Sequence, residues 1–386
     1  MKKRWYRLVP AALCLMLSLS ACGKEDENTE FTGDTTQELP YQSNLNAITP
    51  AAYNNVKGLE LEPGTFISVI GKDNSSSYWS EVKRGVQQAA DDLNEELGYT
   101  GEEKIKVTYN APAGSEDIDE QVNILDEELA RYPDALVISS IGAEACHVQF
   151  DLATENGIPI IAMDSANSHQ GVQSTVTTNN EEAGKTCAHK MMDELAETGK
   201  VLVLVHDSDS GSAMEREGSF RTVIAEEAPG MTLTETIYLN TIEDTKALIA
   251  EEQNAQKAEN EEAVVADNIT DEDVIAYYLE KDPQITGVYA TNLYTTQLAV
   301  RGIEKAGKTE TVLIGFDAGK EQVENLKAGK IQGLVVQNPF GMGYASVIAA
   351  ARTVLQSGNE AVVDTGYVWV TEDNLEEPSI KPLLYK

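Results

Sequence analysis

Basic residues are scarce in this sequence of 386 residues, in which 29 Lys and Arg stand against 64 Asp and Glu. The formal net charge of −35 at pH 7 repels nucleic acids and anionic lipid headgroups. The sequence also lacks a basic helix-turn-helix pattern. These two deficits exclude a DNA-binding repressor and predict no nucleic-acid partner, but they say little about a small ligand.

Cysteine and histidine are also scarce, with four of each. Cys14 and Cys22 lie near the N-terminus, so only Cys146 and Cys187 remain and no disulfide framework is present. Those two either pair or, as their apolar helical surroundings favour, stay as buried free thiols. The histidines show no zinc-ligand or catalytic-triad spacing, and no Gly-x-Ser-x-Gly motif occurs. The sequence therefore predicts no metal, no cofactor and no enzymatic activity.

Long apolar runs are absent except for residues 8–19, which are too few to span a membrane. Four basic residues precede this run and Leu19-Ser20-Ala21-Cys22 follows it, which is the pattern of a secretory signal over residues 1–21. The cysteine after small residues resembles the lipobox of bacterial lipoproteins, in which Cys22 would carry the lipid. The alternative is an unlipidated signal with a chance cysteine. We expect an extracytoplasmic protein anchored to the cell membrane by an N-terminal lipid.

Two segments show little regular periodicity. Residues 22–63 are rich in Glu, Asp, Thr, Asn and Gln, and we interpret them as the lipidated N-terminus and a flexible tether. Residues 247–273 are rich in Glu, Ala and Asn and exceed the length that a strand–helix connection needs. This acidic helical insertion is either a solvated surface feature or a docking surface for a partner.

From residue 64 onward, strands alternate with helices, which predicts an α/β fold with parallel sheets. The predicted strands are residues 66–70, 105–109, 135–139, 158–162, 201–205, 233–238, 287–290, 311–315 and 333–336. The predicted helices are residues 78–97, 116–131, 143–156, 181–195, 213–227, 273–279, 294–306 and 320–327. Two groups of about five strands, separated near Thr178-Asn179, indicate two similar lobes.

Polar and aromatic residues follow many of these strands. They are Ser76, Tyr78 and Trp79 after the first, Ser139 after the third, Asp164 after the fourth, Asn292 after residues 287–290, Phe316 and Asp317 after residues 311–315, and Gln337 after the last. Since ligands bind at the carboxyl ends of parallel strands, we expect these side chains to converge. Carboxylates and carboxamides bind hydroxyl groups, and aromatic faces pack on sugar rings. Individually, each Asp or Asn could instead cap a helix, Trp79 could be a core residue and Arg216 a solvated charge.

The body of the chain resembles the type I periplasmic sugar-binding proteins, the ribose- and galactose-binding family. The similarity is carried by YWSEVKRGVQQAADDLN, GIPIIAMDSAN, TTNNEEAGKTCA, SAMEREGSF, VYATNLYTTQLAVRGIEKAGK, LIGFDAG and GKIQGLVVQNPFGMG. The resemblance implies an amino lobe of residues 64–178 plus 338–364 and a carboxyl lobe of residues 179–337 plus 365–386. It also implies three hinge crossovers, near Thr178, Gln337 and Asp364.

The resemblance assigns roles to individual residues. Tyr78 and Trp79 occupy positions that stack on the sugar, and Arg216 occupies the position that reaches the ring or anomeric oxygens. The hydroxyl-binding positions are Asp164, Asn292, Asp317 and Gln337, and Ser76 and Ser139 replace asparagines of the ribose-binding members. Two departures stand out. Ser165 replaces an arginine, and no aromatic residue is present at Asn240-Thr241, where Tyr238 could substitute.

The resulting hypothesis is a monomeric, lipid-anchored solute-binding protein that closes on a sugar or polyol and delivers it to an ABC transporter permease. One alternative is a receptor that presents a sugar-like signal to a membrane sensor kinase, docked through residues 247–273. An alternative of another class is an exported glycosidase that uses Asp164 and Asp317. The sequence does not distinguish an acid from a nucleophile in that pair. The segment from His206 to Gly211 lacks the ligand spacing of a calcium loop, so we interpret it as an ordinary loop.

Overall fold

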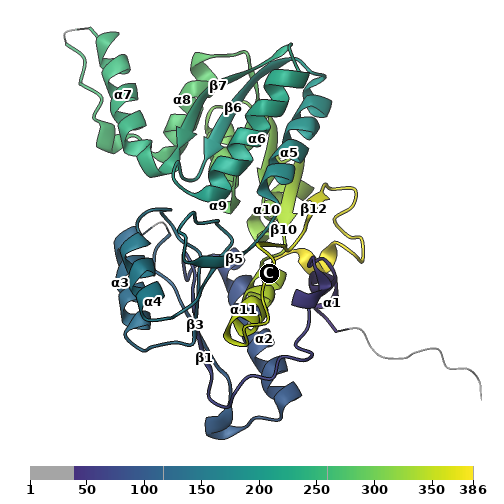
Figure 1. The fold of residues 1–386 in the computed structure, drawn as a ribbon. Helices are drawn as coiled ribbons and strands as arrows, with labels where there is room; N and C mark the ends of the chain where they lie inside the picture. Colours follow the sequence, from purple (N-terminus) through teal and green to yellow (C-terminus); the bar gives the residue numbers. More distant parts are fainter. Residues whose placement is uncertain (1–38, 116, 259, 386) are drawn as a thin grey trace, which may run out of the picture. The chain divides into compact units, whose positions relative to one another are not determined.

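The computed structural model describes residues 39–115, 117–258 and 260–385, which form two lobes, each built on a six-stranded sheet (Figure 1). The first sheet has the spatial order β11 (Val362–Asp364), β5 (Val172–Thr177), β4 (Ile160–Met163), β3 (Ala135–Ile138), β1 (Phe66–Ile70) and β2 (Lys106–Asn110). The second has the order β12 (Tyr367–Val370), β10 (Gly333–Gln337), β9 (Val312–Phe316), β8 (Ile285–Ala290), β6 (Gly199–Val205) and β7 (Met231–Tyr238). Within these sheets, strand pairs are parallel except for β10 with β12.

Helices connect the strands and cover both sheets. They are α1 (Gln42–Asn46), α2 (Ser77–Leu97), α3 (Ile118–Leu129), α4 (His147–Glu155), α5 (Asn180–Leu195), α6 (Gly211–Glu227), α7 (Ile242–Ala255), α8 (Asp271–Lys281), α9 (Leu293–Lys305), α10 (Lys320–Lys327) and α11 (Pro339–Val354). Short 3₁₀ turns cover Ala51–Tyr53, Gly101–Glu103, Leu239–Thr241, Ala266–Asn268 and Lys381–Leu383. Central strands such as β3 and β4 are buried along their whole length, which explains their continuous apolar sequences.

The chain passes between the two sheets three times. It leaves the first sheet after β5, returns after β10 through α11, and leaves again between β11 and β12. Asn338 caps α11 by accepting a hydrogen bond from the backbone N–H of Gly341, so the second crossover ends directly in a helix. The predicted α/β class with two similar lobes is confirmed.

Part of the predicted tether is wrong, because residues 40–61 pack against the body. Leu45, Ile48 and Tyr53 are buried, and Thr49 forms an antiparallel bridge with Asp364 beside the third crossover. The segment forms one short helix and a 3₁₀ turn, which are too brief to give the helical periodicity that the prediction required. Cys22 and the signal sequence lie outside the described residues.

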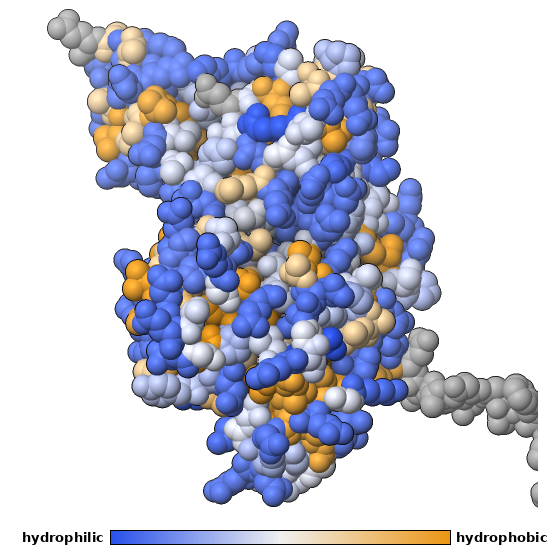
Figure 2. Space-filling model, in the orientation of Figure 1, coloured by the Kyte–Doolittle hydropathy of each residue, from blue (hydrophilic) through white to orange (hydrophobic). Residues whose placement is uncertain are grey.

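The predicted insertion at residues 247–273 consists of the end of α7, a connection with one 3₁₀ turn, and the start of α8. On the face in Figure 2, hydrophilic side chains predominate and apolar ones form separate small patches.

Cys146 and Cys187 are buried, free and in different hydrophobic clusters, as the sequence favoured. Among the described residues, no helix is long and apolar enough to cross a bilayer.

Two glycines allow α2 and α11 to touch backbone to backbone in the first lobe. A Cβ atom at Gly85 would collide with the carbonyl oxygen of Phe340, and one at Gly343 with that of Val82. Gly85→Ala and Gly343→Ala should each lower the free energy of unfolding by about 1–3 kcal/mol, since backbone atoms must separate. Gly218→Ala on α6 is the control, because a Cβ there meets open space. It should be neutral or stabilising in urea denaturation, and equal behaviour of all three variants would contradict the close packing.

Candidate functional site

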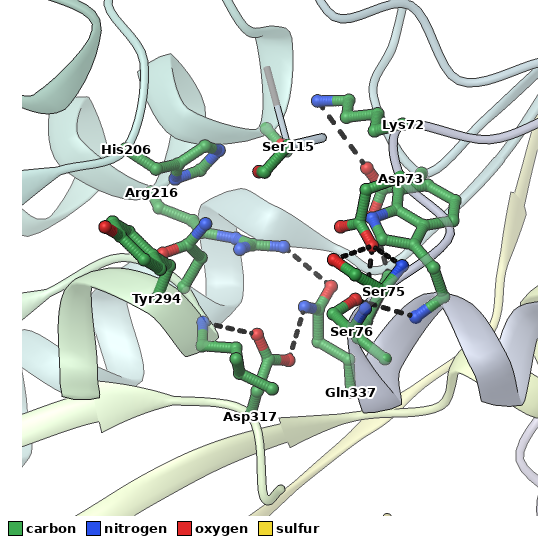
Figure 3. Close-up of a pocket in the computed structure, with 16 residues that line it drawn as sticks. Lys72, Asp73, Ser75, Ser76, Ser115, His206, Arg216, Tyr294, Asp317 and Gln337 are labelled. Carbon is green, nitrogen blue, oxygen red and sulfur yellow. Dashed lines mark hydrogen bonds and ion pairs between the residues drawn. The ribbon is translucent and has the colours of Figure 1, made fainter. Parts of the chain in front are cut away.

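A cavity of about 200 Å³ lies at the carboxyl ends of strands from both sheets (Figure 3). It is lined by Lys72, Asp73, Ser75, Ser76, Tyr78, Trp79, Ser115, Asp164, His206, Ser212, Arg216, Asn292, Leu293, Tyr294, Asp317 and Gln337. The residues come from both lobes, so the cavity is complete only when the lobes are together. The convergence of strand ends that the sequence predicted is present in the structure.

Eight of the ten predicted ligand-binding residues line this cavity: Ser76, Tyr78, Trp79, Asp164, Arg216, Asn292, Asp317 and Gln337. Ser139 and Phe316 lie behind the wall. The Ser139 hydroxyl donates to Asp164 Oδ2 at 3.2 Å, and the Arg216 guanidinium lies 4.4 Å from the centre of the Phe316 ring. We interpret these two as positioning residues. Ser76 and Asn292 also cap α2 and α9, so capping and cavity lining occur together.

Asp164 is the polar centre of the first lobe's wall. It follows β4 in a left-handed conformation, with φ of 62°, which asparagine and aspartate tolerate better than most residues. Its Oδ1 accepts a hydrogen bond from the Tyr78 hydroxyl at 2.7 Å. Its Oδ2 lies 3.9 Å from the ammonium of Lys72. These contacts fix both oxygens at the edge of the cavity.

Asp317 occupies the matching place in the second lobe, after β9, with φ of 71°. Its carboxylate accepts from the backbone N–H of Leu293 at 2.8 Å, from Gln337 Nε2 at 2.9 Å and from the Tyr385 hydroxyl at 3.1 Å. Burial raises the pKa of Asp317, while the nearby Arg216 and these donors oppose that increase. Both aspartates have positive φ values, and residues in such uncommon backbone conformations cluster at functional sites.

Arg216 connects three segments of the site. Its Nε donates to Asn180 Oδ1 at 2.9 Å, one terminal nitrogen to the carbonyl of Thr291 at 2.7 Å, and the other to Gln337 Oε1 at 2.6 Å. The residue is only 2% exposed, so it is not the solvated helix charge that was the alternative. Gln337, which also accepts from Thr178, is thereby held at the junction of two crossovers.

Lys72 was missed by the sequence reasoning, although it lies only two residues after the first strand. Its ammonium donates to the hydroxyls of Ser165 at 2.8 Å and Ser210 at 3.1 Å, which belong to different lobes. The arginine expected at position 165 is absent, and Lys72 supplies a positive charge beside Asp164 instead. Its position after the end of β1 could have predicted that it lines the cavity.

Three aromatic residues were also not predicted at this site. Tyr294 in the first turn of α9 and His206 lie together on one side of the cavity in Figure 3. His206 was interpreted as part of an ordinary loop, but its Nδ1 pairs with Thr291 and burial lowers its pKa well below the usual value, so the ring is neutral. Tyr385 reaches Asp317 from the C-terminal segment and packs edge-on against Tyr78. Sequence offers no signal for such a long-range contact.

Tyr238, the suggested aromatic substitute in the carboxyl lobe, does not line the cavity. Its hydroxyl donates instead to the carboxylate of Glu217, at 2.9 Å from Oε2. Asn240 is also outside this cavity. Besides His206, the aromatic residue that the carboxyl lobe contributes to the lining is Tyr294, which is 46% exposed.

Comparison with known proteins agrees with the two-lobed fold described above. Residues 67–359 match the family described as a periplasmic binding protein domain. The ribose import binding protein RbsB of Bacillus subtilis is 23% identical over 234 residues, which are 61% of this chain and 67% of that protein. The xylitol-binding protein of Mycolicibacterium smegmatis is 23% identical over 303 residues, which are 78% of this chain and 76% of that protein.

Solved structures of similar fold include a carbohydrate transporter solute binding protein from Agrobacterium radiobacter in complex with D-arabinose. It is 27% identical, with a TM-score of 0.68, over 83% of this chain and 98% of that one. An ABC transporter solute binding protein from Agrobacterium vitis with bound D-fucose is 25% identical, also with a TM-score of 0.68, over 83% of this chain and 100% of that one. Since the family match spans most of the sequence and the two-lobed fold agrees with it, this chain belongs to the periplasmic binding protein family.

Proposed function

We propose that this protein captures an uncharged, hydroxyl-rich ligand, a sugar or polyol, and delivers it to an ABC importer. The observation that carries the proposal is the enclosure of Trp79, Asp164, Asp317 and Arg216 around one cavity, with contributions from both lobes. Aromatic faces and bidentate polar groups are the chemistry that sugar rings require. The relatives whose names mention ribose import or xylitol binding support the same ligand class.

The charges in the cavity favour a neutral ligand. Lys72 lies beside Asp164, and the positive charge of Arg216 acts on Asp317, so opposite charges already compensate each other. The remaining carboxylate, Asp73, accepts hydrogen bonds from the backbone N–H groups of Ser75 and Ser76. Each cation of the lining, Lys72 and Arg216, therefore has a carboxylate beside it. Neither is left free to attract an anionic ligand.

The proposed mechanism is capture by closure of the two lobes. Lys72 and Ser165 of the first lobe form hydrogen bonds with Ser210 and Ser212 of the second, next to the cavity. A ligand that contacts both walls binds the closed arrangement better than an open one, and therefore shifts the population toward closure. The importer would then recognise the closed form. We propose capture without chemical conversion, so p-nitrophenyl glycosides should not be hydrolysed.

Affinity should fall as the medium becomes acidic. A ligand hydroxyl donates to the ionised Asp317 carboxylate, and the pKa of this group is raised by burial. Protonation removes the acceptor, so the dissociation constant should rise by up to about tenfold per pH unit below that pKa. Titration calorimetry from pH 7.5 to 4.5 measures the effect. Asp317→Asn, which cannot ionise, should show a flatter profile, and an equally steep profile in that variant would contradict this assignment.

The lipid anchor is a separate proposal that rests on the sequence around Cys22. Two lipid chains on this residue would keep the protein at the membrane, near the importer. A Cys22→Ala variant expressed in the native cell should be released into the soluble extracytoplasmic fraction. Retention of that variant in the membrane would contradict lipidation at this position.

A thermal-shift screen tests the ligand class. The probes are D-ribose, D-arabinose, D-fucose, D-tagatose, D-galactose, xylitol and common disaccharides, with sodium phosphate and L-glutamate as charged controls. We expect at least one neutral compound to raise the melting temperature, since ligand at 100 times Kd contributes about 2.7 kcal/mol. Stabilisation only by the charged controls would contradict the proposal.

A further inference from the structure

A second cavity of about 260 Å³ adjoins the first and is lined mostly by the carboxyl lobe, with Ser115 from the amino lobe. Ser115, His206, Asn292 and Tyr294 line both cavities. The walls that belong to the second cavity alone are formed by Leu239, Asn240 and Asp271. The two spaces therefore meet at the side of the site where Figure 3 shows His206 and Tyr294.

The second cavity exists because no large side chain fills this corner. Asn240 is short and exposed, and it exchanges hydrogen bonds with Ser208 across the loop after β6. Tyr238, the nearest aromatic residue before it, is held away by Glu217. An aromatic ring at position 240 would separate the first cavity from the space beyond. Asparagine leaves the two connected.

The volumes also indicate more than one ring. Each cavity alone is smaller than the roughly 300–1,000 Å³ of typical ligand pockets, whereas the two together fall within that range. The first cavity contains the aspartates and Arg216, which suit one polar ring. A ligand limited to that ring would leave the adjoining space to water.

The walls of the second cavity suit another sugar ring. Tyr294 offers an aromatic ring at the junction, and the residue is nearly half exposed. Asn240 and Asn292 supply carboxamides, and the neutral imidazole of His206 can donate or accept. Asp271 is already paired with Lys246 at 2.8 Å, so it does not favour a cation. Each of these groups matches hydroxyls or the apolar face of a pyranose.

We infer that the ligand of this protein is a disaccharide, with one ring among Trp79, Asp164 and Asp317 and the second ring against Tyr294 and Asn240. This inference rests on the proposed function and narrows its ligand class. The ring in the first cavity supplies most of the polar contacts. The second ring adds stacking and hydrogen bonds that a monosaccharide cannot make.

Calorimetric titration of the full mature chain tests the inference. The probes are cellobiose, maltose, lactose, melibiose and xylobiose, each compared with its constituent monosaccharides. At least one disaccharide should bind about tenfold or more tightly than either of its monosaccharides. In Asn240→Phe, which fills the second cavity, this advantage should disappear while monosaccharide affinity is kept. Asp244→Phe places the same ring at an exposed position of α7 outside both cavities and should behave as wild type.

The possible results separate this inference from the proposed function. If monosaccharides bind and every disaccharide binds more weakly than its constituents, the second subsite is overturned and capture of a sugar stands. The same conclusion follows if Asn240→Phe binds the preferred disaccharide as tightly as wild type while its melting temperature shows a folded protein. Absence of binding by both classes would contradict the proposed function as well.

Discussion

An Arg216→Met variant is expected to lose about 3–5 kcal/mol of unfolding free energy and all measurable sugar binding. The guanidinium donates to three buried acceptors, on Asn180, Thr291 and Gln337, which lie in different segments. Methionine has similar length but no donors, so the buried acceptors on Asn180 and Thr291 would lose this hydrogen bond, at about 1–3 kcal/mol each, and Gln337 Oε1 would keep only the one from the Thr178 hydroxyl. Gln337 would also lose the contact that orients it toward Asp317.

Urea denaturation followed by circular dichroism measures the loss, and titration calorimetry measures binding. Arg221→Met on the same helix is the matched control, since Arg221 is 39% exposed and its buried partner Glu217 keeps hydrogen bonds from Thr236 and Tyr238. We expect a smaller loss in this control, because the carboxylate is not left without a partner. Equal stability losses in the two variants would contradict the central position of Arg216.

Asp164→Asn and Asp317→Asn should each weaken sugar binding at least about tenfold, since hydrogen bonds to charged groups contribute about 1.5–3 kcal/mol. Asparagine is the informative replacement because both positions have positive φ, which alanine adopts at a cost of about 1–2 kcal/mol. The amide keeps the shape but has one acceptor oxygen instead of two. At position 317 its NH₂ group must face either Leu293 N–H or the donors on Gln337 and Tyr385.

Asp91→Asn, on the exposed face of α2, controls for the general loss of negative charge. Calorimetry with the sugar that gives the largest thermal shift should return the wild-type dissociation constant for this control. Wild-type affinity in both Asp164→Asn and Asp317→Asn would show that the ligand binds elsewhere.

The sequence predicted Asp164, Asn292, Asp317 and Gln337 in the cavity lining because these residues end or follow strands. Position after a strand is a local property, and parallel strands bring their carboxyl ends together wherever the sheet forms. The same rule, applied to Lys72 at the end of β1 and to His206 at the end of β6, would have found them. Lys72 was not considered, and His206 was considered only for metal-ligand or catalytic-triad spacing and was interpreted as part of a loop. Tyr385 does not follow a strand at the site, so no local sequence pattern indicates that it contacts Asp317.

The fold was less predictable at its edges than at its centre. β5, β11 and β12 were not predicted, since β5 has only two apolar residues, Val172 and Val176, and the other two strands are only three and four residues long. Their pairing depends on neighbours distant in sequence, as with Thr175 beside Val362. The packing of residues 40–61 depends in the same way on the crossover at Asp364. Composition alone suggested a tether there.

The most direct test is a crystal structure of the protein grown with the sugar that stabilises it most in the thermal-shift screen. We predict electron density for a ring in the cavity between the lobes, packed on Trp79, with hydroxyls within about 3.2 Å of the carboxylates of Asp164 and Asp317. Density for the sugar at any other place, with this cavity filled only by water, would contradict the account.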